Sequence, residues 1–202
     1  MGRIDKGLVP LTGRPLAEWV LRTVRPQVDA LLLNSDNPAY GRFGYPLLSD
    51  AVPDRPGPLA GMLAALEAAE TEFVLTVPCD TPHLPADLVA RLCAILRESG
   101  ADIAVASDGD RMHPVVNLAR RSLAPSLRNY LESGKRRVQD WVQAQRFVEV
   151  KFGAETSAFT NVNTPEGLRT VEQQVKNGQL QAPVLGFAAF SFAVRYLNVY
   201  PE

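Results

Sequence analysis

An aspartate follows a strongly apolar run in the first half of the chain. Residues 73–78 read Phe-Val-Leu-Thr-Val-Pro, which predicts a buried strand, and Asp80 comes two residues later, between prolines. A carboxylate on such a rigid stem suits Mg²⁺, which takes oxygen ligands, keeps waters and bridges to phosphate. An aspartate that caps the next turn would explain the same pattern equally well. Asp80 is therefore a candidate metal ligand with one competing explanation.

A loop rich in glycine and proline precedes an apolar helix at residues 53–61, which read Pro-Asp-Arg-Pro-Gly-Pro-Leu-Ala-Gly. Gly57 would let a ligand approach the backbone closely, and the first N–H groups of a helix attract anions. Taken alone, an ordinary loop with Pro58 at the first helical position is the simpler explanation.

Two more polar residues follow short apolar runs, as Asp80 does. Asn34 comes after Ala-Leu-Leu-Leu, and Asp50 comes after Leu-Leu-Ser. In open α/β sheets, ligands bind outside the carboxyl ends of the strands, so we expect Asn34, Asp50 and Asp80 along one edge. Lys6 could neutralise phosphate charge there, although a lone lysine is far more often a solvated surface residue.

Two asparagines, Asn161 and Asn163, come just before a predicted helix at residues 165–176. Thr164 has the side chain of a helix N-cap. Two amides on alternate residues could also orient a substrate or a metal-bound phosphate.

Three consecutive basic residues, Lys135, Arg136 and Arg137, form the longest basic run of the chain. They are most simply a solvated helix start, but together they could clamp an anionic substrate. His113, which precedes a proline, is most simply a histidine at the edge of a strand.

The elements that must position these residues alternate between helix and strand. Helical spacing and stop signals predict helices at residues 14–24, 58–69, 85–98, 122–133, 138–145 and 165–176. Short apolar runs predict strands at residues 28–34, 73–78, 103–106, 114–118 and 147–151. This alternation predicts an α/β protein of three layers, with helices on both faces of a mostly parallel sheet.

The composition excludes several classes of protein. The 202 residues are 46% hydrophobic with a net charge of −1, which fits a globular domain and not a nucleic-acid binder. No stretch has the length of a membrane span, and the N-terminus does not read as a signal peptide. Cys79 and Cys93 match no zinc or redox spacing, so we expect a cytoplasmic protein with reduced cysteines.

The motifs also form an ordered set along about residues 1–174. Its members are Met1-Gly2, Asp5-Lys6-Gly7-Leu8, Gly13-x-Pro15-Leu16, Asn34, Ser49-Asp50, Pro56-Gly57-Pro58-Leu59-Ala60-Gly61-Met62, Pro78-Cys79-Asp80-Thr81-Pro82, His113-Pro114 and Asn161-Val162-Asn163-Thr164-Pro165-Glu166. In this order and spacing they resemble the molybdenum cofactor guanylyltransferase family, often called MobA. A Walker-type ATPase is excluded because no G-x-x-x-x-G-K-[ST] motif occurs.

The resemblance implies a role for each matching residue at the nucleotide. Lys6 matches the catalytic lysine that contacts the nucleotide phosphates, and Asp80 matches the Mg²⁺ ligand, which is also catalytic. Asn34 and Asp50 match positions that line the guanine nucleotide site. The matching loop beside the nucleotide contains Gly57 and Gly61.

The resemblance also implies where the second substrate binds. Asn161 and Asn163 match a pair that faces the metal and the pterin. Arg136 and Arg137 lie where the molybdopterin end of the site is expected.

The reaction that the resemblance implies is transfer of GMP from GTP to the terminal phosphate of molybdopterin, with release of pyrophosphate. Mg²⁺ and Lys6 would neutralise charge while the phosphates are held in line, with no covalent intermediate. The implied fold is the Rossmann-like fold of the nucleotide-diphospho-sugar transferases, and MobB is an implied partner. Two alternatives stay open: a cytidylyltransferase of the same family, and a nucleotide- or molybdopterin-binding protein with little or no turnover.

Both ends of the chain depart from the family pattern. The family opens with a strand and an L-A-G-G-x-x-x-R-M-G loop, and this chain begins at what matches the final M-G. We therefore expect a nucleotidyltransferase domain at residues 1–176 that lacks its first strand and glycine-rich loop, followed by a linker and atypical tail at residues 177–202. Residues 183–191 resemble the first strand of MobB. The apolar run at residues 184–190 could occupy the first-strand position, or lie at an edge of the sheet.

Overall fold

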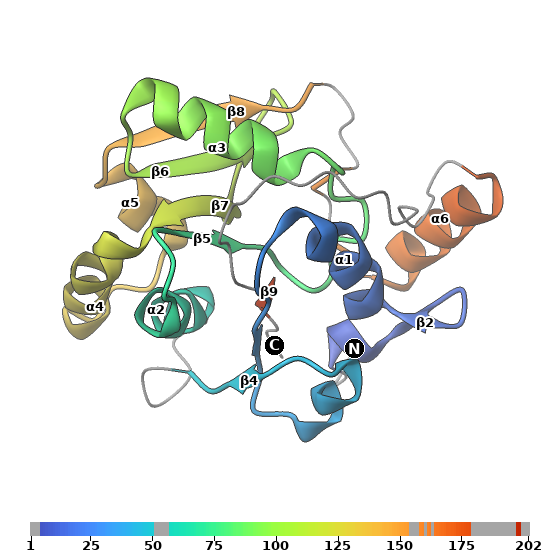
Figure 1. Cartoon of the computed structure of the whole chain (residues 1–202). Helices are drawn as coiled ribbons and strands as arrows, with labels where there is room; N and C mark the ends of the chain where they lie inside the picture. Colours follow the sequence, from blue (N-terminus) through green and yellow to red (C-terminus); the bar gives the residue numbers. More distant parts are fainter. Residues whose placement is uncertain are drawn as a thin grey trace.

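The largest sheet of the protein has four strands in the order β5–β7–β6–β8 (Figure 1). They are β5 (Phe73–Thr76), β6 (Ile103–Ser107), β7 (Met112–Arg120) and β8 (Phe147–Lys151). The computed structural model describes residues 5–50, 57–153, 158–159, 161–162, 164–178 and 197–198. β6 and β8 are parallel, whereas β7 is antiparallel to both of its neighbours. The predicted α/β class is confirmed, and the sheet is mixed because β7 runs against the strands beside it.

A three-stranded parallel sheet continues this arrangement, in the order β4–β3–β9. Its strands are β3 (Leu33–Asn34), β4 (Leu47–Leu48) and β9 (Leu197–Asn198). β9 pairs with β3 and also contacts β5, so it lies between the two sheets (Figure 1). The strand predicted at residues 184–190 lies outside the described residues. β9 belongs to the predicted tail and lies in the sheet.

Helices cover both faces of the sheet, as predicted (Figure 1). The first face carries α1 (Leu16–Val24) and α3 (Leu88–Ser99), and the second carries α2 (Pro58–Ala68), α4 (Ala124–Glu132) and α5 (Val138–Gln143). Successive side chains of a strand point to opposite faces. Accordingly, Phe73 and Leu75 belong to the core under α1 and α3, while Val74 belongs to the core under α2 and α4.

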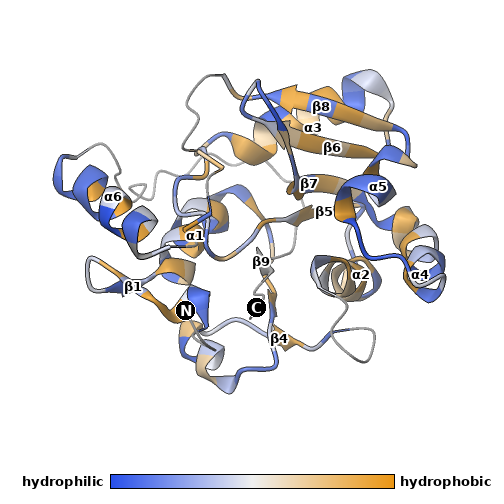
Figure 2. Ribbon diagram, turned by 180° about the vertical axis from the view of Figure 1, so that it is seen from behind, coloured by the Kyte–Doolittle hydropathy of each residue, from blue (hydrophilic) through white to orange (hydrophobic). Residues whose placement is uncertain are grey.

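α2 is buried on nearly every side. Residues 59–66 are all buried, because the helix packs between the strands and α4. A helix that is apolar all round is stable only in such a position. Figure 2 shows the same distribution, with hydrophobic strands inside and the hydrophilic surface of α4 outside.

The remaining described elements lie outside these two sheets and the helices that cover them. They are a hairpin of β1 (Pro10–Leu11) and β2 (Arg14–Pro15), α6 (Pro165–Lys176), and the short helices η1 (Lys6–Leu8), η2 (Arg25–Gln27), η3 (Pro38–Phe43) and η4 (Arg121–Leu123). Trp19 of α1 joins Leu11 and Val171 in a small separate core. Thr164 caps α6 as predicted, because its hydroxyl accepts the N–H of Gly167 at 3.0 Å. Within the described part of the chain, no helix has the length and apolarity to cross a membrane.

Several element boundaries differ from the prediction. Residues 14–15, predicted as the start of a helix, form β2 instead and pair with β1, so that α1 starts at Leu16. The strand predicted at residues 28–34 is limited to Leu33–Asn34, because its neighbour β4 is equally short. The helix predicted from residue 85 starts at Leu88. The residues before it form turns instead, with the N–H of Leu88 bonded to the carbonyl of Pro85 at 3.2 Å.

Candidate active site

Asp80 lies beyond the carboxyl end of β5, with only 7% of its surface exposed. Its backbone carbonyl accepts the N–H of Val162 at 2.9 Å. The adjacent Thr81 is fully buried, and its hydroxyl donates to the side-chain oxygen of Asn161 at 3.1 Å. These two bonds bring a segment from the far end of the sequence against the Asp80 loop. Asn163, the second predicted asparagine, lies outside the described residues.

Lys6 is brought to the same place by its neighbour Gly7. A Cβ atom at Gly7 would lie 2.3 Å from the hydroxyl oxygen of Tyr40 and 3.0 Å from the sulfur of Cys79. Only a residue without a side chain can approach so closely without displacing its neighbours. The Lys6 segment is therefore packed directly against the residue that precedes Asp80.

Asp5 anchors the other side of this segment. Its carboxylate accepts hydrogen bonds from the hydroxyl of Tyr40 and from the side-chain amide of Asn37, the latter at 2.9 Å. Burial raises the pKa of Tyr40, so its hydroxyl keeps the proton that it donates. Asp5 belongs to the predicted Asp5-Lys6-Gly7-Leu8 motif, and the structure gives it a positioning role that sequence reasoning did not assign.

Asn34 and Asp50 lie at the carboxyl ends of β3 and β4, as predicted. Asn34 is 2% exposed, and its amide donates to the carbonyl of Leu48 at 2.9 Å. This bond ties the ends of the two strands together, so Asn34 shapes the edge on which Asp50 sits. Their contact with a nucleotide stays a prediction.

Gly57 and Gly61 both belong to the start of α2. Gly57 has φ of 78° and ψ of −155°, a conformation that side chains disfavour, and it directly precedes the helix. Gly61 is buried in the helix itself. The preceding loop, residues 51–56, lies outside the described residues. The structure thus explains Gly57 by backbone geometry, and its role beside a nucleotide stays a prediction.

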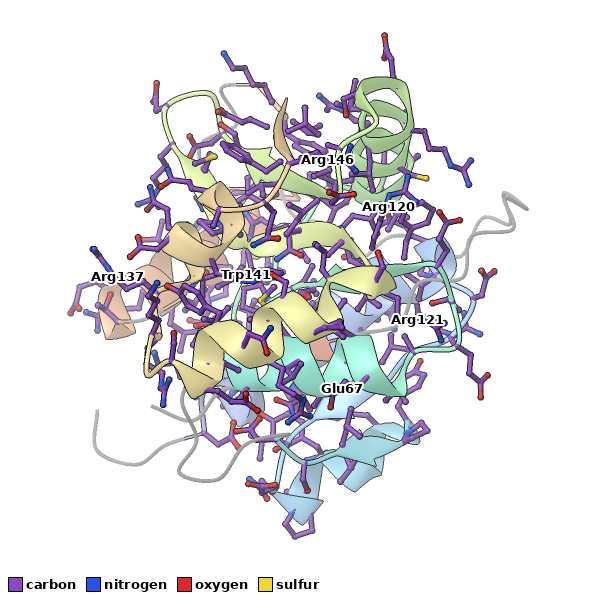
Figure 3. The ribbon with its side chains drawn as sticks, turned by 90° about the vertical axis from the view of Figure 1, so that its left-hand side faces the viewer. Glu67, Arg120, Arg121, Arg137, Trp141 and Arg146 are labelled. Atoms are coloured by element: carbon purple, nitrogen blue, oxygen red, sulfur yellow. The ribbon has the colours of Figure 1, made fainter. Side chains whose placement is uncertain are left out.

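The predicted basic run lies between the end of α4 and the start of α5. Arg120 pairs with Phe73 at the amino end of β5, and Figure 3 shows Arg137 on the far side of the molecule from Arg120. Arg136 donates to the carbonyls of Leu131 and Lys135 at 2.8 and 2.7 Å, so it supports the end of α4. The side chain of Arg137 is 84% exposed, 3.9 Å from Asp140, and it is the better placed of the two for a substrate.

His113 lies at the start of β7, as its sequence context suggested, and it is buried there. Only 9% exposed, it makes a 2.8 Å hydrogen bond from Nε2 to the carboxylate of Asp108. Asp108 also accepts the backbone N–H groups of Arg111 and Asp110, at 2.9 and 3.0 Å. The bond from Arg111, followed by that from His113, lowers the pKa of Asp108 to about 2.

The buried pair of His113 and Asp108 is connected to the candidate active site by the ring of Phe159. The rings of His113 and Phe159 have centroids 5.1 Å apart, and Phe159 also meets Phe152 edge-on at 5.3 Å. Phe159 lies two residues before Asn161, so the ring contacts support the segment that faces Asp80. An Asp-Gly-Asp turn between two strands is the only sequence signal for this arrangement.

The arrangement can position and neutralise phosphates. It combines a buried carboxylate, an amide oxygen and a lysine at one edge of the sheet, where α/β proteins bind ligands. Among the residues that the structure describes, no cluster of three or more histidine, cysteine, aspartate or glutamate side chains could hold a metal without further ligands.

Comparison with known proteins identifies the family. A sequence profile described as "MobA-like NTP transferase domain" matches residues 1–150. The chain belongs to this family of nucleotidyltransferases. It is 44% identical over 168 residues to a molybdenum cofactor guanylyltransferase of Shewanella sp. (strain MR-4), covering 82% of this chain and 85% of the relative. A protein of the same name from Cupriavidus pinatubonensis is 44% identical over 179 residues, covering 85% and 89%.

Solved structures agree on the fold of this MobA-like chain. The molybdopterin-guanine dinucleotide biosynthesis protein A of Archaeoglobus fulgidus superimposes with a TM-score of 0.71 over 86% of this chain and 92% of that one, at 21% identity. A putative protein from Aquifex aeolicus gives 0.66 over 74% and 79%, at 19% identity. The predicted nucleotidyltransferase fold is therefore confirmed. Enzymes of this family generally use a divalent metal ion.

Proposed function

We propose that this MobA-like chain transfers GMP from GTP to the terminal phosphate of molybdopterin and releases pyrophosphate. The observation that carries the proposal is the joining of three separate segments at Asp80. The Asp80 loop bonds to the Asn161 segment, and Cys79 beside it packs against Gly7 next to Lys6. The names of relatives that are 44% identical to this chain over the aligned residues support the same reaction.

The residues of the chain would act by positioning and by charge. In this reaction a phosphate oxygen of molybdopterin attacks the α-phosphorus of GTP, and the bond to the β-phosphate oxygen breaks. Lys6, held in place by Gly7, would balance negative charge on the triphosphate as pyrophosphate leaves. Arg137, whose side chain is exposed at the start of α5, would attract the anionic end of molybdopterin. No side chain has to form a covalent bond.

We propose Mg²⁺ as the divalent ion. Asp80 supplies a carboxylate and Asn161 an amide oxygen, which are ligands that Mg²⁺ takes in proteins. Thr81 donates one hydrogen bond to Asn161 Oδ1, so that oxygen keeps a second lone pair for an ion or a phosphate-bound water. Asp80 and Asn161 would hold the ion, which would supply positive charge to stabilise the negative charge that develops on the phosphates.

The choice of base follows from the relatives. They are named for guanylyl transfer, which supports GTP over the CTP of a cytidylyltransferase. MobB, implied as a partner by the resemblance, belongs to the same proposal.

Pyrophosphate release tests the proposal directly. The protein is incubated with Mg²⁺, molybdopterin and either GTP or CTP, and isothermal titration measures binding of each nucleotide. We expect release with GTP at a rate at least about tenfold above that with CTP. Faster release with CTP would favour a cytidylyl relative, and equal release would contradict a preference for guanine. Binding without release would favour a protein that only binds, and no nucleotide binding would refute the proposal.

Replacing Asp80 tests the metal assignment. The change Asp80→Asn keeps the shape of the side chain and removes its charge, so we expect the rate with GTP and Mg²⁺ to fall at least about a hundredfold. Asp87→Asn is the matched control, since Asp87 lies at the start of α3 with a side chain 61% exposed and should leave the rate unchanged. A near-normal rate for Asp80→Asn would show that another group holds the metal.

A further inference from the structure

A pocket of about 490 Å³ lies along α1 (blue in Figure 1), away from the candidate active site. Its lining residues come from α1 with the start of η2, and from the end of η3 with the turn after it: Glu18, Leu21, Arg22, Arg25, Arg42, Phe43 and Tyr45. None of them belongs to the candidate active site. The volume is in the range of pockets that hold small organic molecules, roughly 300–1,000 Å³.

The floor of this α1 pocket is apolar and well supported. Leu21 is 4% exposed and belongs to the main core, and Phe43 and Tyr45 are half-buried against the same core. The ring of Phe43 lies 5.9 Å from that of Tyr40, which is fully buried. The floor therefore offers aromatic surface whose position is set by packing, and a flat ring can stack on such a surface.

The rim of the pocket is positively charged. Arg22, Arg25 and Arg42 contribute three guanidinium groups. Within the described ranges no carboxylate pairs with any of them. Arg25 donates one hydrogen bond to the carbonyl of Val28 at 2.9 Å, which is neutral and leaves its charge in place.

The one acid in the lining does not cancel this charge. Glu18 forms an ion pair with Arg14, four residues earlier in the sequence, with a nitrogen–oxygen distance of 2.6 Å. Its carboxylate is thus turned to a partner outside the lining, although Arg22 is equally close in sequence. The lining therefore has three guanidinium groups and one carboxylate, and the charge of that carboxylate is balanced by Arg14.

We propose that the α1 pocket binds a small organic anion, specifically a planar ring that carries a phosphate or carboxylate group. Guanidinium groups present paired N–H donors that match the oxygens of these anions. The aromatic floor would hold the ring, while an inorganic ion would reach the rim only. The proposal does not depend on guanylyl transfer, because the pocket shares no residue with the site of that reaction.

Two probes test this assignment and separate nucleotide from pterin ligands: adenosine 5′-monophosphate and pterin-6-carboxylate. Backbone amide shifts are followed by NMR in the full chain as each probe is added. We expect at least one probe to shift the amides of residues 21–25 and 42–45 with saturation below about 1 mM. Adenosine and inorganic phosphate, which each lack one half of the proposed ligand, should bind at least tenfold more weakly.

Variants at the rim complete the test. The double variant Arg22→Ala/Arg42→Ala should weaken binding at least tenfold, and both side chains are exposed, so the fold should persist. Arg169→Ala, which removes an exposed arginine of α6, is the matched control and should bind as the unchanged protein does. The proposal is overturned if neither probe shifts these amides, if the double variant binds as tightly, or if phosphate alone binds as well as the better probe.

Discussion

At the carboxyl edge of the sheet, single residues decide how closely the segments of the site approach one another. Lys6 reaches the neighbourhood of Asp80 because Gly7 leaves room for the hydroxyl of Tyr40 and the sulfur of Cys79. Tyr40 in turn is fixed by its hydrogen bond to Asp5. The chemistry of the lysine thus depends on a neighbour that has no side chain.

The change Gly7→Ala tests this dependence. An added methyl group 2.3 Å from the Tyr40 oxygen has to displace buried atoms, which costs about 1–3 kcal/mol. We expect a midpoint of thermal unfolding lower by roughly 2–4 °C per kcal/mol, together with a slower rate of pyrophosphate release. Gly41→Ala is the control, because nothing lies within 4 Å of a Cβ there. Equal effects of the two changes would contradict the close approach at Gly7.

Asp108 makes stability depend on pH in the acid range. Its pKa is about 2 in the folded protein and 3.8 when unperturbed, so the unfolded chain binds protons first as the pH falls. Its contribution to stability is complete above pH 3.8 and is lost as the pH falls towards 2. Urea denaturation of Asp108→Asn and of the unchanged protein is therefore compared at about pH 5 and about pH 2.5, on either side of this window. The urea midpoint of Asp108→Asn should be the lower of the two at the higher pH, and the two midpoints should approach each other at the lower pH. A constant difference between the two proteins would contradict the assignment.

Among the elements, the segment that ends in Asn161 and Val162 has no helix or strand of its own in the described residues. It is held by the ring of Phe159 against His113 at one end and by bonds to Asp80 and Thr81 at the other. Loops that carry functional groups are commonly positioned by a rigid scaffold in this way.

β9 is short, but its removal should destabilise the protein because of its position in the sheet. It pairs with β3 and contacts β5, so its loss would leave strand edges without a partner in the middle of the sheet. We expect removal of residues 179–202 to lower the thermal midpoint by at least about 5 °C, which for this size corresponds to roughly 1–3 kcal/mol. Removal of residues 199–202 alone keeps β9 and should change little. Unchanged stability in the longer deletion would show that β9 contributes nothing to the sheet.

On the scale of the whole molecule, the carboxyl and amino ends of β5 and β6 carry different kinds of residues. The carboxyl ends gather the candidate active site, whereas the amino ends carry surface ion pairs. Arg146 donates two hydrogen bonds to the carboxylate of Asp102, at 2.8 and 2.7 Å, and these lower the pKa of Asp102. Arg120 lies beside Arg146 (Figure 3). Substitutions at the amino ends should therefore leave the chemistry intact.

Arg146→Ala tests that separation. The side chain of Arg146 is 74% exposed, so water screens the ion pair and its loss should cost less than about 1 kcal/mol, with no change in pyrophosphate release. Trp141→Ala is the contrasting change, because Trp141 is a fully buried residue of α5 and its truncation should cost about 3–5 kcal/mol. Chemical denaturation measures both values. A slower reaction in folded Arg146→Ala would contradict the division between the two ends.

The sequence by itself determined the features that depend on local chemistry. The helix at Pro165–Lys176 and the strand at Phe147–Lys151 lie where apolar spacing and capping residues predict them, because these signals act over a few residues. It also placed Asn34, Asp50 and Asp80 at or just beyond the carboxyl ends of strands, and the ordered motifs indicated the family.

Only the tertiary structure decided which segments meet. An apolar run predicts that a strand is buried but not the direction of its neighbours, so the antiparallel β7 and the insertion of β9 beside β3 had no local signal. The contact of Gly7 with Tyr40 and Cys79, and the burial of His113 against Asp108, likewise join residues through the fold. Such contacts depend on the topology of the whole chain, because packing brings together side chains whose own sequence context leaves their partners open.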